Sequence, residues 1–347
     1  MIYELLLNIS IPTFNRAKRL EKTLLSVAQE IAIHNLHNLV GILVVDNASS
    51  DCTNLVIEKF NKFASANGIV VQTVRLAKNI GGGRNFIECA YQSNSDYIVF
   101  LSDDDNLFPG AIKELVDKID KWKPALILCN FLQHPWSLEN PLYIEEELNT
   151  DQNELDWLSS QVKFYKLSGI TLRVRDKTEI ALLREETWIR GFGHILLVII
   201  LFKAYGRGLA SDLFFAYPDA DLYEHIDFAP YVSEIMLYEL RRLRESGFIT
   251  EEEEIKLSSQ IPRQSVNSRS LHRLYEYYQG DFSLTIQVKS QLWKNILDAM
   301  VFRRKNSREG LQLYVVPKDY LRLVRMALAM LKAITLERFG IEVTRTR

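Results

Sequence analysis

Short apolar runs alternate with helical patterns along the first 131 residues, and this alternation limits the possible fold more than any other feature. The apolar runs lie at Leu5–Ile11, Leu39–Val45, Ile69–Leu76, Tyr97–Leu101 and Ala125–Phe131. Runs of this kind are typical of strands that are buried on both faces of a mostly parallel sheet. Between them, apolar residues recur at helical spacing over Leu20–Ile31, Asn54–Phe63 and Ala111–Trp122. The pattern predicts an α/β fold with a doubly wound sheet.

The sequence beyond residue 131 is less regular. Residues 139–156 hold seven acids and no Lys, Arg or His, which predicts an exposed loop, or alternatively a lid. Val162–Val174 is typical of one or two strands. From residue 221 onward the pattern is mainly helical, with Glu251–Glu254 at a helix start. We therefore predict one domain over residues 1–215, with halves 1–131 and 132–215, followed by a mainly helical region over 216–347.

Composition narrows the class of protein. The chain has 347 residues, 47% hydrophobic and 25% charged, as in a soluble globular protein. A net charge of −2 provides no basic field, so we expect no nucleic-acid partner. Cys52, Cys89 and Cys129 form no Cys-x-x-Cys pair, which argues against disulfides and zinc and for a reducing compartment. The start lacks a signal-peptide pattern, and Ile195–Phe202, the longest apolar run, is too short to span a bilayer. We predict a cytoplasmic protein.

The C-terminal tail is basic, although the chain as a whole has a small negative charge. Residues 301–347 hold eleven Lys and Arg against four acids. Within the tail, residues 320–339 combine leucines with basic residues, as a basic amphipathic helix does. Such a helix could lie on an anionic leaflet and make the protein peripheral on the inner face of the cytoplasmic membrane. Packing on the rest of the chain, or on a second subunit, is the alternative.

Polar and glycine residues follow each of the first four predicted strands. These segments are Ser10–Arg16, Asp46–Asp51, Lys78–Asn85 and Asp103–Asp105. In open α/β sheets, ligands bind beyond the carboxyl ends of the strands. One polar strand end is an ordinary turn, but four in succession favour a nucleotide-sized site.

The acidic triplet Asp103–Asp105 needs neutralisation or solvent, because its charges repel one another. At the exit of a buried strand, a divalent cation such as magnesium or manganese is a suitable partner, and these ions usually arrive with phosphates. An ordinary acidic loop is the alternative.

The other segments suggest roles in anion and base binding. Gly81–Gly83 opens a helix whose N-terminus favours an anion, and Arg84 could grip a phosphate or lie on the surface. Asp46 could accept an N–H from a base, or cap the following turn with Ser49 and Asp51. The chain has neither the G-x-G-x-x-G nor the P-loop spacing, which disfavours a Rossmann dehydrogenase and a P-loop NTPase.

Taken together, the four segments over residues 8–131 resemble the successive signatures of family 2 glycosyltransferases. The resemblance implies a GT-A fold, that is, a Rossmann-like nucleotide-diphospho-sugar transferase domain, here followed by a mostly helical C-terminal region. It implies a nucleotide-diphosphate sugar as donor and a glycan or lipid-linked acceptor, in the synthesis of bacterial surface polysaccharides. Residues 1–131 would be the donor-binding half and 132–215 the acceptor-side half.

The resemblance also assigns residues to the donor site. The donor would contact Pro12, Thr13, Asn15, Arg16, Asp46, Asn47, Asn79, Gly82, Gly83, Arg84, Asp103 and Asp104. The D-x-D element, Asp103 and Asp105, would hold Mg²⁺ or Mn²⁺ against the diphosphate. Such a cation acts as a Lewis acid on the leaving group.

Enzymes of this kind typically invert the anomeric centre, which requires a general base for the acceptor hydroxyl. The family pattern places the base about ninety residues beyond the D-x-D element. That part of the chain contains Glu185, Glu186 and His194 but not the commoner Glu-Asp pair. Either glutamate could serve as the base, with Asp176 further back. His194 could be the base, a neighbour of the metal, a sugar contact or simply a buried histidine.

Two other functions share some of these features. A sugar-1-phosphate nucleotidyltransferase would carry a glycine-rich loop after its first strand, where this chain has Pro12–Arg16. A non-catalytic subunit that binds a nucleotide sugar would keep the donor site and lack a working base.

Overall fold

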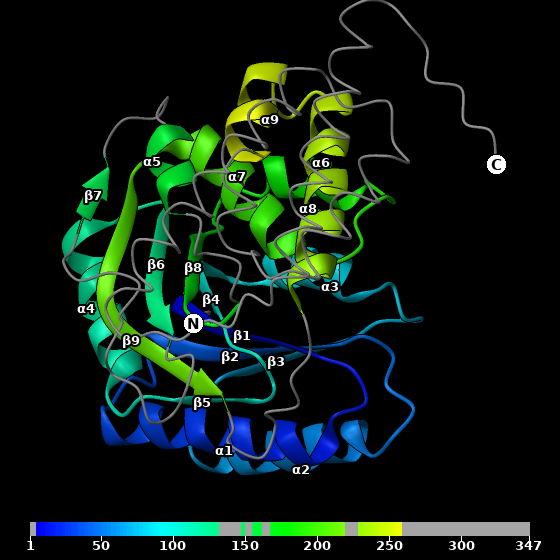
Figure 1. The fold of residues 1–347 in the computed structure, drawn as a ribbon. Helices are drawn as coiled ribbons and strands as arrows, with labels where there is room; N and C mark the ends of the chain where they lie inside the picture. Colours follow the sequence, from blue (N-terminus) through cyan, green and yellow to red (C-terminus); the bar gives the residue numbers. More distant parts are fainter. Residues whose placement is uncertain (1–4, 132–146, 150–154, 162–166, 219–227, 259–347) are drawn as a thin grey trace, which may run out of the picture. The chain divides into compact units, whose positions relative to one another are not determined.

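The computed structural model describes residues 5–131, 147–149, 155–161, 167–218 and 228–258 (Figure 1). The predicted amphipathic helix at 320–339 and most of the acidic segment 139–156 lie outside these ranges. The chain falls into two units, residues 1–225 and 226–347. Because residues 219–227 are not described, the domain boundary at residue 215 stays a prediction.

The described strands of the first unit form one nine-stranded sheet in the order β3-β2-β1-β4-β8-β6-β9-β5, with β7 paired to β9. Their bounds are β1 Leu5–Thr13, β2 Val40–Asp46, β3 Val71–Arg75, β4 Ser95–Phe100, β5 Asp105–Leu107, β6 Leu126–Phe131, β7 Glu147–Asn149, β8 Ile170–Arg173 and β9 Gly208–Pro218. All five predicted apolar runs are strands. The order β3-β2-β1-β4 is parallel, while β8 runs antiparallel between β4 and β6.

Helices cover both faces of this sheet, which confirms the doubly wound arrangement (Figure 1). Helices α1 (Ala17–Ile33) and α2 (Thr53–Ala66) lie on one face, and α4 (Ala111–Trp122) shares their apolar core. The opposite face carries α3 (Gly82–Gln92), α6 (Thr178–Arg184) and α7 (Gly193–Tyr205). A short helix, α5 (Leu155–Ser160), follows β7.

The apolar run Ile195–Phe202 lies in α7, and every residue in it is buried. A helix that is apolar on all sides is typical of a protein interior. Among the described helices, none combines the length and apolarity needed to cross a membrane.

The described part of the second unit consists of α8 (Phe228–Glu245) and α9 (Glu251–Ser258). As predicted, Glu251–Glu254 begins a helix. Arg244 of α8 donates a hydrogen bond to Glu254 of α9 over 2.5 Å, so an ion pair joins the two helices.

Candidate functional site

The carboxyl ends of β1, β2 and β4 bring three predicted donor residues to one edge of the sheet. Thr13 pairs with Asp46 in the parallel β1–β2 ladder, and Ser10 pairs with Phe100 of β4. Asp103 follows β4 directly, and its Oδ2 accepts a hydrogen bond from Thr13 Oγ1 over 2.7 Å. Thr13, Asp46 and Asp103 are all buried. The register of the strands therefore groups these three buried polar side chains at the carboxyl edge of an otherwise apolar sheet.

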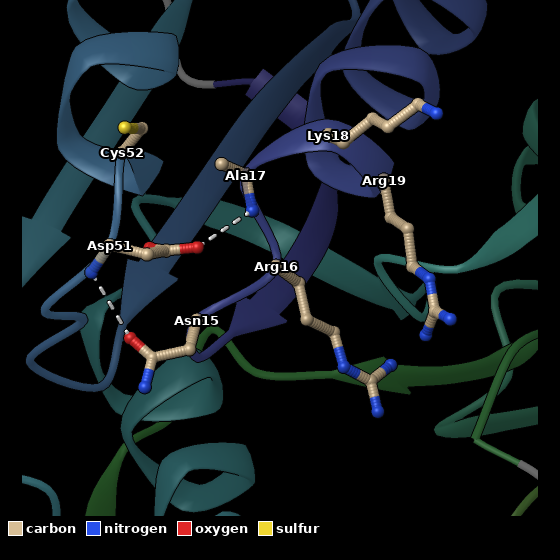
Figure 2. Close-up of a pocket in the computed structure, with 7 residues that line it drawn as sticks. All are labelled: Asn15, Arg16, Ala17, Lys18, Arg19, Asp51 and Cys52. Carbon is tan, nitrogen blue, oxygen red and sulfur yellow. Dashed lines mark hydrogen bonds between the residues drawn. The ribbon is translucent and has the colours of Figure 1, made fainter.

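Arginines at the start of α1 neutralise two of the three adjacent aspartates. Arg16 Nη1 donates to Asp103 Oδ1 over 3.0 Å and also to Asp104. Arg19 Nη1 lies 3.7 Å from Asp104 Oδ2. Figure 2 shows both guanidinium groups extending to the same side of α1. This pairing was not predicted from sequence, although the i, i+3 spacing of the two arginines indicates that they lie on the same helix face.

Burial raises the pKa of the Asp103 carboxyl to about 6, and this effect exceeds the opposing effects of Arg16 and the Thr13 hydrogen bond. The charges of Asp103 and Asp104 in turn raise the pKa of Arg16, despite the burial that would lower it. At pH 7 Asp103 is therefore ionised and held in an ion pair.

The raised pKa of Asp103 predicts that stability falls as the pH rises from about 4 to about 6. In the unfolded chain the carboxyl releases its proton near 3.8, so within this range only the folded protein keeps the proton. In Asp103→Asn, the free energy of unfolding should fall by about 2 kcal/mol less over this pH range than in the wild type. Denaturant unfolding of the metal-free protein at pH 4 to 7 measures it, with Asp117→Asn, an exposed acid of α4, as the control. Parallel curves for wild type and Asp103→Asn would contradict the prediction.

Asp105 is held differently from its two neighbours. It begins β5, pairs with Pro218 of β9 and is half-buried. Its Oδ2 accepts a hydrogen bond from Ser168 Oγ over 2.6 Å. Within the part of the chain that the structure describes, no group of three His, Cys, Asp or Glu side chains could hold a metal ion by itself.

The Asp46 carboxylate has the capping role that the sequence left open, while its role toward a base stays a prediction. Its Oδ1 accepts the Ser49 N–H over 2.9 Å and so caps the turn after β2. Its Oδ2 is buried and accepts no hydrogen bond from the described residues, and Arg75 Nε lies 3.7 Å away. Oδ1 therefore stabilises the turn, whereas Oδ2 is a hydrogen-bond acceptor at the sheet edge that no described residue uses.

The Asn47 side chain ties the end of β2 to the glycine segment. Its Nδ2 donates to Asn79 Oδ1 over 3.0 Å and to the Gly81 carbonyl over 3.3 Å. Its Oδ1 accepts the Ile80 N–H over 2.9 Å. Asn79 in turn accepts the Gly81 N–H over 2.8 Å. The predicted donor residues Asn47 and Asn79 are therefore in direct contact.

The glycine segment opens α3, as predicted, but its glycines serve different purposes. A Cβ on Gly82 would meet nothing within 4 Å, so this backbone is open to a ligand. A Cβ on Gly83 would lie 2.8 Å from the backbone of Arg190 and Gly191. The Gly83 N–H also donates to the Arg190 carbonyl over 3.2 Å. Gly83 is therefore required for close packing against Arg190 and Gly191, whereas Gly82 faces open space.

The segment predicted to supply the base lies against the first turn of α3. Arg84 Nη2 contacts the Arg184 carbonyl over 3.5 Å, at the end of α6. Glu185 follows as an exposed residue and Glu186 as a half-buried one. Both glutamates therefore directly follow a residue that contacts the predicted donor residue Arg84. Asp176 lies at the other end of α6, where it accepts the Thr178 N–H over 2.9 Å.

His194 lies in the first turn of α7 and is 4% exposed. The Phe86 ring packs edge-on against its imidazole, with ring centroids 4.8 Å apart. This environment matches the buried-histidine alternative. The catalytic roles of Glu185, Glu186 and His194 stay predictions.

A pocket of about 570 Å³ opens beside this edge, at the starts of α1 and α2 (Figure 2). Its lining is Asn15, Arg16, Ala17, Lys18, Arg19, Asp51 and Cys52. Asn15 has a φ angle of +55°, and its side-chain oxygen accepts the Ser50 N–H. This hydrogen bond connects the segments that follow β1 and β2. Pro12, another predicted donor residue, is buried within β1. Asp51 accepts N–H groups from Ala17 and Thr53, so its carboxylate already caps both helices. We assign this pocket no ligand.

A family comparison places these residues in a known class. Residues 9–173 match the model described as Glycosyl transferase family 2. This part of the chain is a family 2 glycosyltransferase domain, and the class is one of transferase enzymes. The matched residues include the carboxyl ends of β1, β2, β3 and β4, the start of α3, and Ser168.

Two curated relatives share part of this sequence. One is the GalNAc(5)-diNAcBac-PP-undecaprenol beta-1,3-glucosyltransferase of Campylobacter jejuni, 30% identical over 116 residues, which are 33% of this chain and 35% of that protein. The other is Abequosyltransferase RfbV of Salmonella typhimurium, 29% identical over 159 residues, which are 44% of this chain and 46% of that protein. The chain therefore matches less than half the length of either relative.

Solved structures confirm the GT-A fold. The structure of S. aureus TarS 1–349 in complex with UDP-GlcNAc gives a TM-score of 0.53 at 14% identity, over 90% of this chain and 95% of that chain. Mannosyltransferase PcManGT from Pyrobaculum calidifontis, in complex with GDP-Man and Mn²⁺, gives 0.52 at 11% identity, over 96% and 83%. At such identities the likeness concerns the fold alone.

Proposed function

We propose that this protein is a metal-dependent glycosyltransferase that moves a sugar, with inversion, from a nucleotide-diphosphate sugar to a glycan or lipid-linked acceptor. The observation that carries the proposal is the convergence of Thr13, Asp46 and Asp103 at one edge of the sheet, to which Asn47 ties the start of α3. The relatives support a setting in bacterial glycoconjugate synthesis, since one is named for an undecaprenol-diphosphate acceptor. The predicted membrane contact of residues 320–339 and the location in the cytoplasm stay predictions.

The nucleotide would lie along the ends of β1, β2 and β3. Asp46 Oδ2 is a buried acceptor that suits an N–H of the base. The diphosphate would face the N-terminus of α3, where the open backbone at Gly82 allows close approach and the helix dipole favours an anion. Arg84 follows in the first turn of that helix.

A divalent cation fits this edge best at Asp105. Mg²⁺ is usually held by one or two carboxylates together with substrate phosphates, so a cluster of three protein ligands is not required. Both oxygens of Asp103 already accept hydrogen bonds, from Thr13 and Arg16, and Asp104 is paired with Arg16 and Arg19. We assign the cation to Asp105, the second aspartate of the D-x-D element, whose carboxylate accepts the Ser168 hydroxyl. The metal role predicted for Asp103 stays a prediction. When bound, the cation would offset negative charge on the leaving diphosphate.

The acceptor hydroxyl must lose a proton as the new bond forms, and we propose Glu185 or Glu186 as the base that takes it. Both follow α6, whose end contacts Arg84. Either glutamate is better suited than His194, which is buried against Phe86.

The base assignment predicts opposite results for two neighbouring variants. One of Glu185→Gln and Glu186→Gln should lower the rate of sugar transfer by about 10²- to 10⁴-fold, the usual contribution of general-base catalysis. The other should stay within about threefold of wild type, and both should bind the nucleoside diphosphate normally. Initial rates and thermal shifts with the nucleoside diphosphate provide the measurement. If both variants transfer sugar at the wild-type rate, neither glutamate is the base.

Product analysis tests the proposed function itself. The protein would be incubated with Mn²⁺, a panel of UDP-, GDP- and dTDP-sugars, and undecaprenyl-diphosphate-linked glycans. Release of the nucleoside diphosphate together with a longer glycan is the expected result. Release of pyrophosphate would favour the nucleotidyltransferase. Thermal stabilisation by a donor without any product would favour the non-catalytic binding subunit.

A further inference from the structure

The hydroxyl of Ser168 joins two residues at the end of β4. Ser168 precedes β8 and is 3% exposed. Its Oγ accepts the N–H of Ser102 over 2.9 Å and donates to Oδ2 of Asp105 over 2.6 Å. A serine hydroxyl has a single proton, and an amide N–H can only donate. The proton of Ser168 therefore points to the Asp105 carboxylate.

The backbone beside Ser168 is fixed by Gly169. Gly169 has φ +92°, and its N–H donates to the Phe100 carbonyl over 3.0 Å. A Cβ on this residue would lie 3.1 Å from Cys129 Cβ and 3.2 Å from Phe215 Cβ. The conformation and the close neighbours both favour glycine at this position. The turn is therefore held against the end of β4, and the Ser168 hydroxyl with it.

The backbone of Asp105 is restrained as well. Its N–H donates to the Ser102 carbonyl over 3.3 Å, and the residue pairs with Pro218 across the β5–β9 ladder. Ser168 adds a hydrogen bond to the side chain. The hydrogen bond from Ser168 therefore fixes the direction of the Asp105 carboxylate, on a backbone that Ser102 and Pro218 already hold.

We infer that Ser168 is a positioning residue that orients Asp105 for a divalent cation, an inference that rests on the proposed function. Carboxylates that bind metals are generally hydrogen-bonded in turn by a second layer of residues, and loss of such a partner weakens metal affinity roughly 10- to 100-fold. No sequence signal indicates this role, because Ser168 lies 63 positions from Asp105.

Binding of Mn²⁺ to the full chain tests the inference without relying on catalysis. Mn²⁺ would be titrated in the presence of saturating UDP, GDP or dTDP, and free Mn²⁺ followed by electron paramagnetic resonance. Ser168→Ala should weaken Mn²⁺ binding about 10-fold or more, and Ser168→Thr, which keeps a hydroxyl, should restore most of it. Ser211→Ala is the matched control, because Ser211 is also buried and its hydroxyl also accepts a backbone N–H, that of Leu213.

The outcomes separate the inference from the function on which it rests. Mn²⁺ affinity in Ser168→Ala within twofold of wild type would overturn the positioning role and leave the metal site in place. An equal loss in Ser211→Ala, with equal loss of thermal stability, would also overturn it, since the effect would then be general. If the wild type binds no Mn²⁺ with any of the three nucleotides, the proposed metal site itself is wrong.

Discussion

Asp105→Asn is expected to lower the rate of sugar transfer about 100-fold or more. Asparagine keeps an oxygen that can accept the Ser168 hydroxyl, so the local hydrogen bond survives while the negative charge is lost. A cation that offsets charge on a leaving group contributes several kcal/mol to catalysis, and a neutral amide holds such an ion weakly. Initial rates across a series of Mn²⁺ concentrations provide the measurement. The variant should need much more Mn²⁺ and reach a lower maximum.

Asp117→Asn is the control for this prediction. Asp117 is an exposed acid on α4 that pairs with Lys113, and its loss also changes the net charge by one. Its rate should match that of the wild type, because exposed ion pairs contribute little to stability. A wild-type rate and Mn²⁺ dependence in Asp105→Asn would exclude Asp105 as the metal ligand.

Gly193→Ala is expected to unfold the protein or reduce its free energy of unfolding by about 3 kcal/mol or more. Helices α3 and α7 meet at Gly83 and Gly193, where a Cβ on Gly193 would lie 1.9 Å from the Gly83 carbonyl oxygen. The two nearest atoms belong to the Gly83 backbone, so a side-chain rotation cannot make room. Denaturant unfolding and circular dichroism measure the loss.

Gly82→Ala is the matched control, because its Cβ would meet no atom within 4 Å. Its stability should equal or slightly exceed that of the wild type, since alanine is favoured over glycine within a helix by up to about 1 kcal/mol. Its affinity for the nucleotide sugar should nevertheless fall, because the new methyl group would occupy the open backbone at the start of α3. Equal stability of Gly193→Ala and Gly82→Ala would show that the two helices do not meet closely at Gly193.

The local features of the fold could be predicted from sequence because short apolar runs and helical spacing are local properties. The predicted helix Ala111–Trp122 coincides with α4, which follows Pro109 and Gly110. The order of strands in the second half of the sheet could not be predicted. The three-residue strands β5 and β7 carry too little pattern, and β9 contains Ser211 and Asp212 within an otherwise apolar run. The place of β8 between β4 and β6 depends on distant parts of the chain.

The same reasoning explains which parts of the site could be predicted. Parallel strands share one carboxyl edge, so the convergence of Thr13, Asp46 and Asp103 followed from strand order alone. The partners of the acidic triplet did not, because Arg16 and Ser168 lie 87 and 63 positions from the aspartates that they contact. The sequence indicated that the three charges needed partners, and the fold supplies two arginines and a serine.

The hydrogen bonds of Asn47 have a consequence for the thermodynamics of donor recognition. They hold residues 79–81 in place before any ligand arrives, so the conformational entropy of this loop is lost on folding and not on association. A nucleotide sugar would then bind to a preordered loop. Less of the interaction enthalpy would be offset by loss of loop entropy, so the affinity would be higher than with a flexible loop. Selectivity among sugars should accordingly depend on the fit to a preformed surface, and less on a segment that closes around each candidate.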